Sequence, residues 1–256
     1  ALDSGAQDAA GTFQRRAVVG LQGSFGTITI GREYGPIAAV AQSGDPLGHG
    51  FYGSTLTSFG TGRLTRRLSN SVNYKSDSLN GFTVLASYSA GERNVDPSND
   101  LWGAAVEYKN GPIYLGGGYQ ETEAQIGPNN KEYALGAGFT AGAFDFRAAY
   151  LEADPAGANN EYKYTTVGGV YTMGPNKFYA SVHQQKLETG AKGNGFSLAY
   201  SYTLSKRTNL YTSYAKLRNN GRGVFGVASA GGTFAPPTTA LGADPSVFNM
   251  GVRHSF

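Results

Sequence analysis

The residues that catalysis would require are scarce and isolated in this chain. The three histidines, His49, His183 and His254, have no serine motif or metal-ligand spacing around them. Cysteine is absent, which rules out disulfides, thiolate chemistry and cysteine-based metal sites. No predicted helix follows the glycine run at 116–118, so we interpret it as close packing within a strand rather than a phosphate-binding loop. The sequence therefore predicts no catalytic centre, no metal site and no cofactor.

Arginine is the residue type whose spacing suggests a function. Arg63, Arg66 and Arg67 lie close together at the end of a long connection that begins at Glu33 and contains Asp45. One interpretation is a solvated cluster of charge on an exposed loop, which needs no function. The other is a selectivity element, because arginines that line a narrow water-filled passage favour anions. The second interpretation requires a scaffold that encloses such a passage.

Much of the chain alternates between apolar and small or polar residues with a period of two, which indicates β-strands with one apolar face. The segment FSLAYSYTL at 196–204, for example, places its aromatic and leucine side chains on one face and Ser, Ala and Thr on the other. The same alternation recurs at 82–89, 102–109, 132–139 and 144–150. A half-buried strand of a soluble sandwich shows this pattern too, so alternation alone leaves soluble and membrane proteins open.

The connections between the predicted strands fall into two classes that alternate along the chain. Tight turns rich in Gly, Asn, Pro and Ser lie near residues 22–26, 77–81, 109–112, 140–143, 173–176 and 204–208. Longer connections, which hold most of the Pro, Asp and Asn, span about 33–66, 90–100, 123–131, 152–162, 186–195 and 217–246. Short turns at one end of the strands and long loops at the other are typical of an outer-membrane β-barrel. A soluble sandwich has no reason to sort its loops in this way.

Composition and the placement of aromatic residues also favour a membrane barrel. Charged residues make up 15% of the chain, below the ~25% usual in soluble proteins, and no apolar run approaches the ~18–20 residues of a membrane helix. Tyr, Phe and Trp gather where apolar faces meet turns or loops, as in the interfacial girdles of such barrels. A formal net charge of +3, without a basic run, gives no indication of nucleic-acid binding.

The last ten residues, VFNMGVRHSF, also form a predicted strand, whose outward face begins at Phe248 and ends at Phe256. With this strand the count reaches about 13. Bacterial single-chain barrels have even counts, so we expect that N-terminal strands of the pattern are absent from this chain. The segment 1–12 is interpreted as part of a connection on the long-loop side.

Four segments resemble the trimeric general porins of Gram-negative bacteria, in particular the beta-proteobacterial branch. They are FQRRAVVGLQGSFGTITIGREYG from Phe13, NSVNYKSDSLNGF from Asn70, YTLSKRTNLYTSYAKLRN from Tyr202, and the final GVRHSF. The resemblance implies an all-β fold, a transmembrane antiparallel β-barrel of the 16-stranded porin type, of which about 13 strands are present and the first three are not. It also implies that residues 1–256 form a single porin domain, with the connection at about 33–66 folded inward to narrow the channel.

Site residues are carried over from the same resemblance. The implied pore constriction combines wall arginines, loop arginines and two loop acids: Arg15, Arg67, Arg63, Arg66, Glu33 and Asp45. Arg15 and Arg67 match pore-lining arginines of the family's basic wall. Strand parity places Arg15 on the face of Ala17, which we take as the inner face, and Arg16 on the other, toward a subunit interface. The implied signal for barrel assembly consists of three residues of the terminal strand: Phe256, His254 and Val252.

The expected function is that of an outer-membrane general diffusion porin, a passive water-filled channel for small hydrophilic solutes and ions with an anion preference. The expected partners are further copies of the chain in a homotrimer, outer-membrane lipid and lipopolysaccharide, the barrel-assembly machinery, and the small ions and solutes themselves; no nucleic acid is expected. Ile28 and Ile30, outward on a strand with few girdle aromatics, suggest a wall covered by protein. An outer-membrane β-barrel enzyme and a soluble or adhesive β-sheet surface protein remain as alternatives.

Overall fold

The computed structural model describes residues 15–229 and 240–255, and every structural statement below refers to them. Their strands form one antiparallel sheet of 13, in which each strand pairs with its neighbours in the chain, so the predicted count is confirmed. The strands are β1 (Ala17–Gly23), β2 (Gly26–Tyr34), β3 (Arg67–Lys75), β4 (Phe82–Ser89), β5 (Leu101–Asn110), β6 (Ile113–Thr122), β7 (Asn130–Ala141), β8 (Phe144–Asp154), β9 (Tyr162–Met173), β10 (Asn176–Leu187), β11 (Lys192–Ser205), β12 (Thr208–Asn219) and β13 (Ser246–His254). Two helices, α1 (Pro36–Ser43) and α2 (Leu56–Phe59), lie between β2 and β3.

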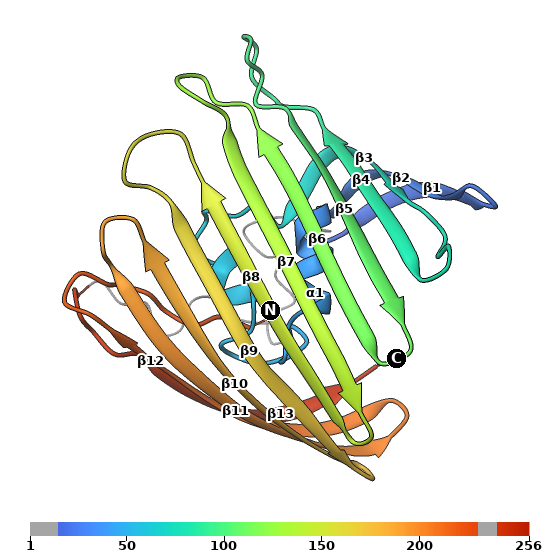
Figure 1. Ribbon diagram of the computed structural model, residues 1–256, viewed down its shortest axis with the longest axis vertical. Helices are drawn as coiled ribbons and strands as arrows, with labels where there is room; N and C mark the ends of the chain where they lie inside the picture. The colour runs from blue at the N-terminus through green and yellow to red at the C-terminus, as the bar shows by residue number, and fades with distance from the viewer. Residues whose placement is uncertain (1–14, 230–239, 256) are drawn as a thin grey trace, which may run out of the picture.

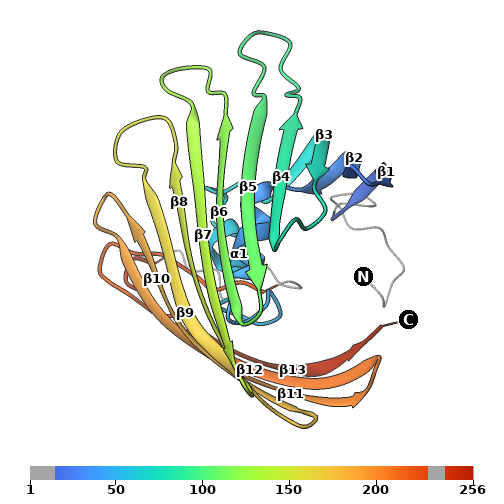
Figure 2. The same cartoon turned by 45° about the vertical axis from the view of Figure 1, so that its right-hand side comes forward.

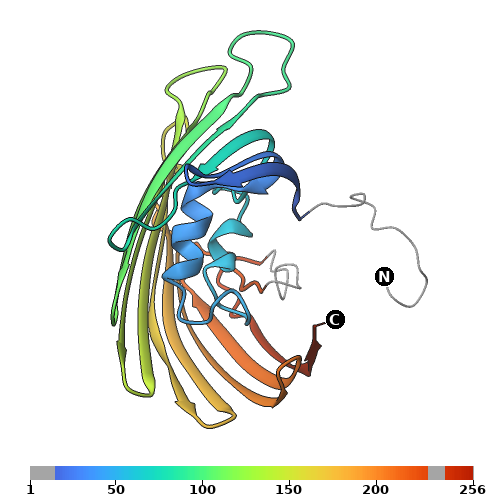
Figure 3. The same cartoon turned by 90° about the vertical axis from the view of Figure 1, so that its right-hand side faces the viewer.

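The sheet curves around a concavity that holds both helices (Figures 1 and 3). Among the described residues, β1 pairs only with β2 and β13 only with β12, so these two strands form the edges of the sheet. Tight turns join the strands at one end and longer loops at the other, as the sequence predicted (Figure 2). No helix within the described ranges is long and apolar enough to cross a membrane.

The outer face of the sheet carries a band of exposed apolar side chains. Leu135, Phe146 and Leu198 are 58%, 52% and 53% exposed, at positions where the period-two pattern predicted an apolar face. Ring pairs lie at both ends of this band. Phe82 and Tyr108 meet at 4.7 Å between centroids near the tight turns, and Trp102 and Tyr119 meet at 5.3 Å near the long loops, in the places expected of interfacial girdles. The following ring pairs extend the two rows: Phe144–Tyr171, Phe178–Tyr200 and Tyr119–Tyr133.

Where α1 lies against β5–β8, the inner face of the sheet consists mainly of Gly and Ala, and this allows the helix to pack directly on the sheet. Ile37, Val40 and Ala41 of α1 are fully buried there. A Cβ atom at Gly118 would lie 3.5 Å from Ile37, and one at Gly136 would lie 3.1 Å from the carbonyl oxygen of Val40. Larger side chains at these positions would push the helix away from the wall. The apolar core therefore lies inside the concavity, between the inward-folded connection and the wall.

Candidate pore constriction

The connection between β2 and β3 folds into the concavity, as the resemblance implied. Because β2 extends to Tyr34, the loop occupies residues 35–66 rather than 33–66. Its two ends meet where the Gly35 amide donates to the Arg66 carbonyl oxygen at 3.1 Å. Pro36 starts α1 at a position where a missing backbone N–H costs nothing. We call residues 35–66 the constriction loop.

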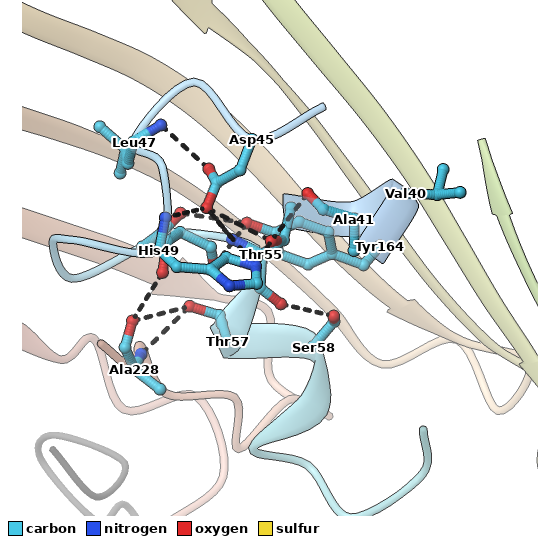
Figure 4. Close-up of polar contacts among 12 residues, drawn as sticks. Val40, Ala41, Asp45, Leu47, His49, Thr55, Thr57, Ser58, Tyr164 and Ala228 are labelled. Atoms are coloured by element: carbon cyan, nitrogen blue, oxygen red, sulfur yellow. Dashed lines mark hydrogen bonds and ion pairs between the residues drawn. The ribbon is translucent and has the colours of Figure 1, made fainter. Parts of the chain in front are cut away.

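Asp45 organises the interior of the constriction loop (Figure 4). Its carboxylate accepts the backbone N–H groups of Leu47 at 3.0 Å, His49 at 2.8 Å and Thr55 at 3.2 Å. The Thr55 hydroxyl also donates to it at 3.3 Å, and His49 Nε2 lies 2.7 Å from that hydroxyl oxygen. Burial raises the pKa of Asp45 to about 6, although the four hydrogen bonds that its carboxylate accepts act in the opposite direction. Burial lowers the pKa of His49 to about 3. The resemblance implied that Asp45 is one of the acids of the pore constriction, but its carboxylate is buried inside the loop.

Side chains of the barrel wall hold the constriction loop at two further places. The Tyr164 hydroxyl lies 3.0 Å and 3.1 Å from the carbonyl oxygens of Gly53 and Ser54. Glu132 accepts the Thr65 backbone N–H at 2.7 Å and the Thr65 hydroxyl at 2.8 Å. The second contact fixes the segment directly before Arg66, so it also positions the arginines.

A second connection also reaches into the concavity, which was not predicted from the sequence. Residues 220–229, which follow β12, lie against the constriction loop. The Ala228 carbonyl oxygen accepts the Gly53 backbone N–H at 3.2 Å, and the Ala228 N–H donates to the Thr57 hydroxyl at 3.1 Å. From the wall, the Gln185 side-chain amide donates to the Gly226 carbonyl oxygen at 3.0 Å. The constriction loop is therefore braced by a segment about 170 residues away in the chain.

Arginines gather around Tyr34 at the base of the constriction loop. The guanidinium carbons of Arg66 and Arg67 lie 5.0 Å and 5.5 Å from the centre of the Tyr34 ring. Arg67 and Arg15 both interact with the Tyr34 side chain. Burial, and then the charges of Arg67 and Arg15, lower the pKa of Arg66 to about 10, which leaves it charged at neutral pH. Three of the predicted site arginines are thus brought together; Arg63 lies apart, with its guanidinium 5.9 Å from the Tyr162 ring centre.

The parity prediction for Arg15 and Arg16 is wrong. Ala17 begins β1 on the same face as Val19 and Leu21, which are both 74% exposed on the outside of the sheet. Arg16 is therefore directed inward, where its guanidinium meets the Glu33 carboxylate at 2.7 Å. Arg15 still reaches the arginine cluster because it precedes the strand, and the two-residue period does not fix its direction. The pairing with Arg16 neutralises Glu33, an acid that the sequence set against the arginines.

Two other inner-wall contacts were not assigned a role from the sequence. Arg253 of β13 donates to the Gly50 carbonyl oxygen at 3.3 Å, at the tip of the constriction loop. The two-residue period of β13 places Arg253 on the face opposite to the outward residues, and this pattern could have predicted its inward position. Arg147, which pairs with Asp145 at 2.8 Å, also donates to the Ser43 carbonyl oxygen at the end of α1.

Val252 and His254, two residues of the implied assembly signal, lie on the outer face near the end of the last strand. Val252 is 64% exposed there, and His254 Nδ1 lies 2.8 Å from the Thr208 hydroxyl on β12. Phe256 lies outside the described residues. A role of these residues in assembly stays a prediction.

A curved antiparallel sheet with an apolar outer face and a loop folded into its concavity is the architecture of a membrane β-barrel channel. The chain belongs to the Gram-negative porin family, whose model matches residues 1–222. It is 27% identical over 263 residues to the outer membrane porin protein 32 of Delftia acidovorans, an alignment that spans 95% of this chain and 74% of the relative. The resemblance to a beta-proteobacterial porin, and the outer-membrane location that it implied, are confirmed.

Solved porin structures share this fold. An anion-selective porin from Comamonas acidovorans superimposes with a TM-score of 0.77 at 20% identity, over 96% of this chain and 81% of that chain. The trimer form of OmpT from Vibrio cholerae gives a TM-score of 0.72 at 18% identity, over 94% of this chain and 80% of that chain. At these identities the similarity establishes the fold, and the protein is an outer-membrane porin by family.

Proposed function

We propose that this porin is a passive diffusion channel that prefers anions, and that Arg15, Arg66 and Arg67 produce the preference. The observation that carries the proposal is an imbalance of available charge at the base of the constriction loop. The three guanidinium groups lie around the side chain of Tyr34. Two acids near them already have partners, because Glu33 pairs with Arg16 and Asp45 accepts hydrogen bonds inside the loop. Small hydrophilic anions, including small carboxylates, are the favoured solutes.

The size of the effect follows from elementary electrostatics. A unit anion 4 Å from one guanidinium gains about 4 kcal/mol at an effective dielectric of 20, before the cost of desolvation. A small part of this energy suffices for a preference between chloride and potassium, because each 1.4 kcal/mol is about a tenfold ratio. Screening over about 8 Å at physiological ionic strength weakens the effect, so we expect selectivity to fade at high salt.

The test is the reversal potential across a potassium chloride gradient in planar bilayers. We expect an anion-selective native channel and a marked shift toward cations in Arg15→Glu with Arg67→Glu. The matched control is Lys206→Glu with Arg207→Glu, which makes the same change of charge in the tight turn between β11 and β12. A cation-selective native channel, or equal reversal potentials in the native protein and the first variant, contradicts the proposal.

The trimeric state belongs to the same proposal. The outer face of β1–β3 presents the aliphatic side chains of Val19, Leu21, Ile28, Ile30 and Val72, the kind of surface that a neighbouring subunit covers. The Vibrio cholerae neighbour has been solved in a trimer form. Native mass spectrometry of the detergent-extracted protein tests the proposal: three chain masses agree with it, and a monomer contradicts it.

A further inference from the structure

A pocket of about 260 Å³ lies beside Arg63, the predicted constriction arginine that lies apart from the arginine cluster. Its lining comes from three segments: residues 60–63 of the constriction loop, 187–191 at the end of β10 and in the loop after it, and 222–225 after β12. Because the last two segments belong to long connections, the pocket lies at the long-loop end of the channel. Sites for drug-sized ligands typically have about 300–1,000 Å³, so this pocket suits a smaller molecule.

Two arginines from different segments line this pocket, Arg63 and Arg222. The Arg63 guanidinium lies over the Tyr162 ring, 5.9 Å from its centre. Arg222 donates from Nη1 to the Thr189 carbonyl oxygen at 3.3 Å, which leaves the other N–H donors of this guanidinium available. Among the described residues, no carboxylate lies within 4.0 Å of either guanidinium. An anionic group, and a planar carboxylate in particular, is therefore the ligand that these two side chains favour.

The rest of the pocket is mainly apolar, with four side chains in its lining: Leu187, Ala191, Val224 and Phe225. Val224 is 46% exposed, so its methyl groups are accessible to a ligand. Phe225 is buried, and its ring centre lies 6.2 Å from that of Tyr162, the same ring that Arg63 contacts. The cationic and apolar parts of the pocket therefore adjoin. An inorganic anion would use the arginines but leave the apolar surface in water.

Asn219, at the end of β12, holds the apolar part of the pocket in place. Its side-chain amide donates to the Phe225 carbonyl oxygen at 2.9 Å, and its Oδ1 accepts the Phe225 backbone N–H at 3.1 Å. The same amide donates to the Ala243 carbonyl oxygen at 2.6 Å. These bonds tie the segment 222–225 to the barrel wall. A pocket whose walls are held in advance loses less conformational entropy when a ligand binds.

We propose that this pocket binds small carboxylates that carry an apolar group, such as aromatic or branched aliphatic acids. The carboxylate accepts hydrogen bonds from Arg63 and Arg222, and the apolar group packs on Val224. The long loops of such barrels are extracellular, so an incoming solute reaches the pocket before the constriction. This role rests on the proposed function, because only a channel that conducts anions onward makes the pocket a loading site. Conduction also requires that the solute leave again, so the binding is weak and rapidly reversible.

The experiment measures dissociation constants by saturation-transfer NMR of the ligand with the detergent-extracted protein. The probe is benzoate, compared with acetate, which lacks the apolar group, and with benzamide, which lacks the charge. The test variant is Arg63→Gln with Arg222→Gln. The matched control is Lys216→Gln with Arg218→Gln, which removes the same charge from the outer face of β12 near the same end. A third variant, Val224→Thr, keeps the charges and the shape but replaces a methyl group by a hydroxyl.

We expect the native protein and the control to bind benzoate equally well, and more tightly than acetate or benzamide. The test variant should bind benzoate about tenfold more weakly or worse, because it loses charge-assisted hydrogen bonds. Val224→Thr should weaken benzoate binding and leave acetate binding unchanged. Equal affinity of the native protein for benzoate and acetate, or for benzoate and benzamide, overturns the proposal. Unchanged benzoate binding in the test variant, or an equal loss in the control, also overturns it.

The reversal potential of the same proteins in planar bilayers separates this site from the proposed function. The test variant keeps Arg15, Arg66 and Arg67, so its channel should remain as anion-selective as the native one. Anion selectivity without preferential benzoate binding overturns the pocket and leaves the proposed function standing. Preferential benzoate binding that depends on Arg63 and Arg222, in a cation-selective native channel, supports the pocket and contradicts the proposed function alone.

Discussion

The buried Asp45–His49 pair predicts opposite pH dependences for two single substitutions in the constriction loop. The pKa of Asp45 is raised by burial to about 6, and that of His49 is lowered by burial to about 3. An acid with a raised pKa stabilises the closed loop in acid and loses that contribution as the pH rises through 6. A histidine with a lowered pKa contributes stability above its ordinary pKa near 6.5 and loses it as the pH falls toward 3.

The magnitudes follow from 1.36 kcal/mol for each pKa unit. When the pH is lowered from 7 to 4, Asp45 raises the free energy of loop opening by about 2 kcal/mol, and His49 lowers it by about 3 kcal/mol. The two contributions largely cancel in the native protein, which should lose only about 1 kcal/mol. Asp45→Asn leaves the histidine contribution alone, so its loop should open more easily in acid. His49→Asn leaves the aspartate contribution alone, so its loop should become more stable in acid.

Asparagine suits both substitutions. His49 has a φ of 61°, a left-handed conformation that asparagine tolerates better than most residues. At position 45, asparagine keeps one acceptor oxygen for the amides of the loop and removes the titration. His254→Asn serves as a control, because this histidine lies on the exposed outer face of β13.

The assay is amide hydrogen exchange of peptides that cover residues 45–57, measured from pH 4 to pH 7 and divided by the intrinsic exchange rates. The ratio gives the free energy of local opening at each pH. Opposite slopes in the two variants, with a nearly flat native profile, would confirm the reasoning. If both variants keep the native profile, or if their slopes have the same sign, the pair does not titrate as its burial requires.

Two further substitutions test the outer face and the base of the constriction loop. Leu198→Arg, near the middle of β11, should destabilise the folded barrel by about 2–4 kcal/mol in lipid vesicles, with Leu198→Ala as the control; a cost well below that range would place Leu198 away from the bilayer midplane. Glu132→Gln removes a charged acceptor from Thr65, where such hydrogen bonds contribute about 1.5–3 kcal/mol. The base of the loop should then open about 10- to 100-fold more often, and these openings should appear as added current noise in single-channel recordings. The control is Glu123→Gln, at the start of the loop between β6 and β7, which should leave the current noise unchanged.

The outer wall was predictable from the sequence because the period of a strand is fixed by its backbone. Residues such as Leu135 and Leu198 alternate with small or polar neighbours, so only one strand register turns the apolar face outward and the polar face toward the interior. The prediction failed for Arg15 and Arg16 because β1 reads AVVGLQG, where Val18 and Val19 are both apolar. Without alternation, parity cannot tell the two faces apart. The structure settles it through the outward exposure of Val19 and the inward pairing of Arg16 with Glu33.

The interior of the constriction loop was only partly predictable. Asp45 is followed by Pro46, Leu47 and Gly48, a composition that predicts a turn in which the aspartate accepts the amide two residues ahead. That local signal was available, and the Leu47 amide does donate to Asp45. The contact between Thr57 and Ala228 was not predictable in this way. It joins residues about 170 positions apart, and no local pattern records it.

The contacts of the constriction loop predict that the arginines can be altered without loss of the loop. The loop is held by the packing of α1 on Gly118 and Gly136, by the hydrogen bonds of Asp45 and by the contact with Ala228. None of these contacts involves Arg66 or Arg67, whose Nε atoms are buried without hydrogen-bond partners. Clustered like charges oppose folding, so the loop keeps its shape in spite of the arginines and not because of them. A charge reversal there relieves repulsion, which is why a change in ion selectivity can be attributed to the charge itself and not to a collapsed loop.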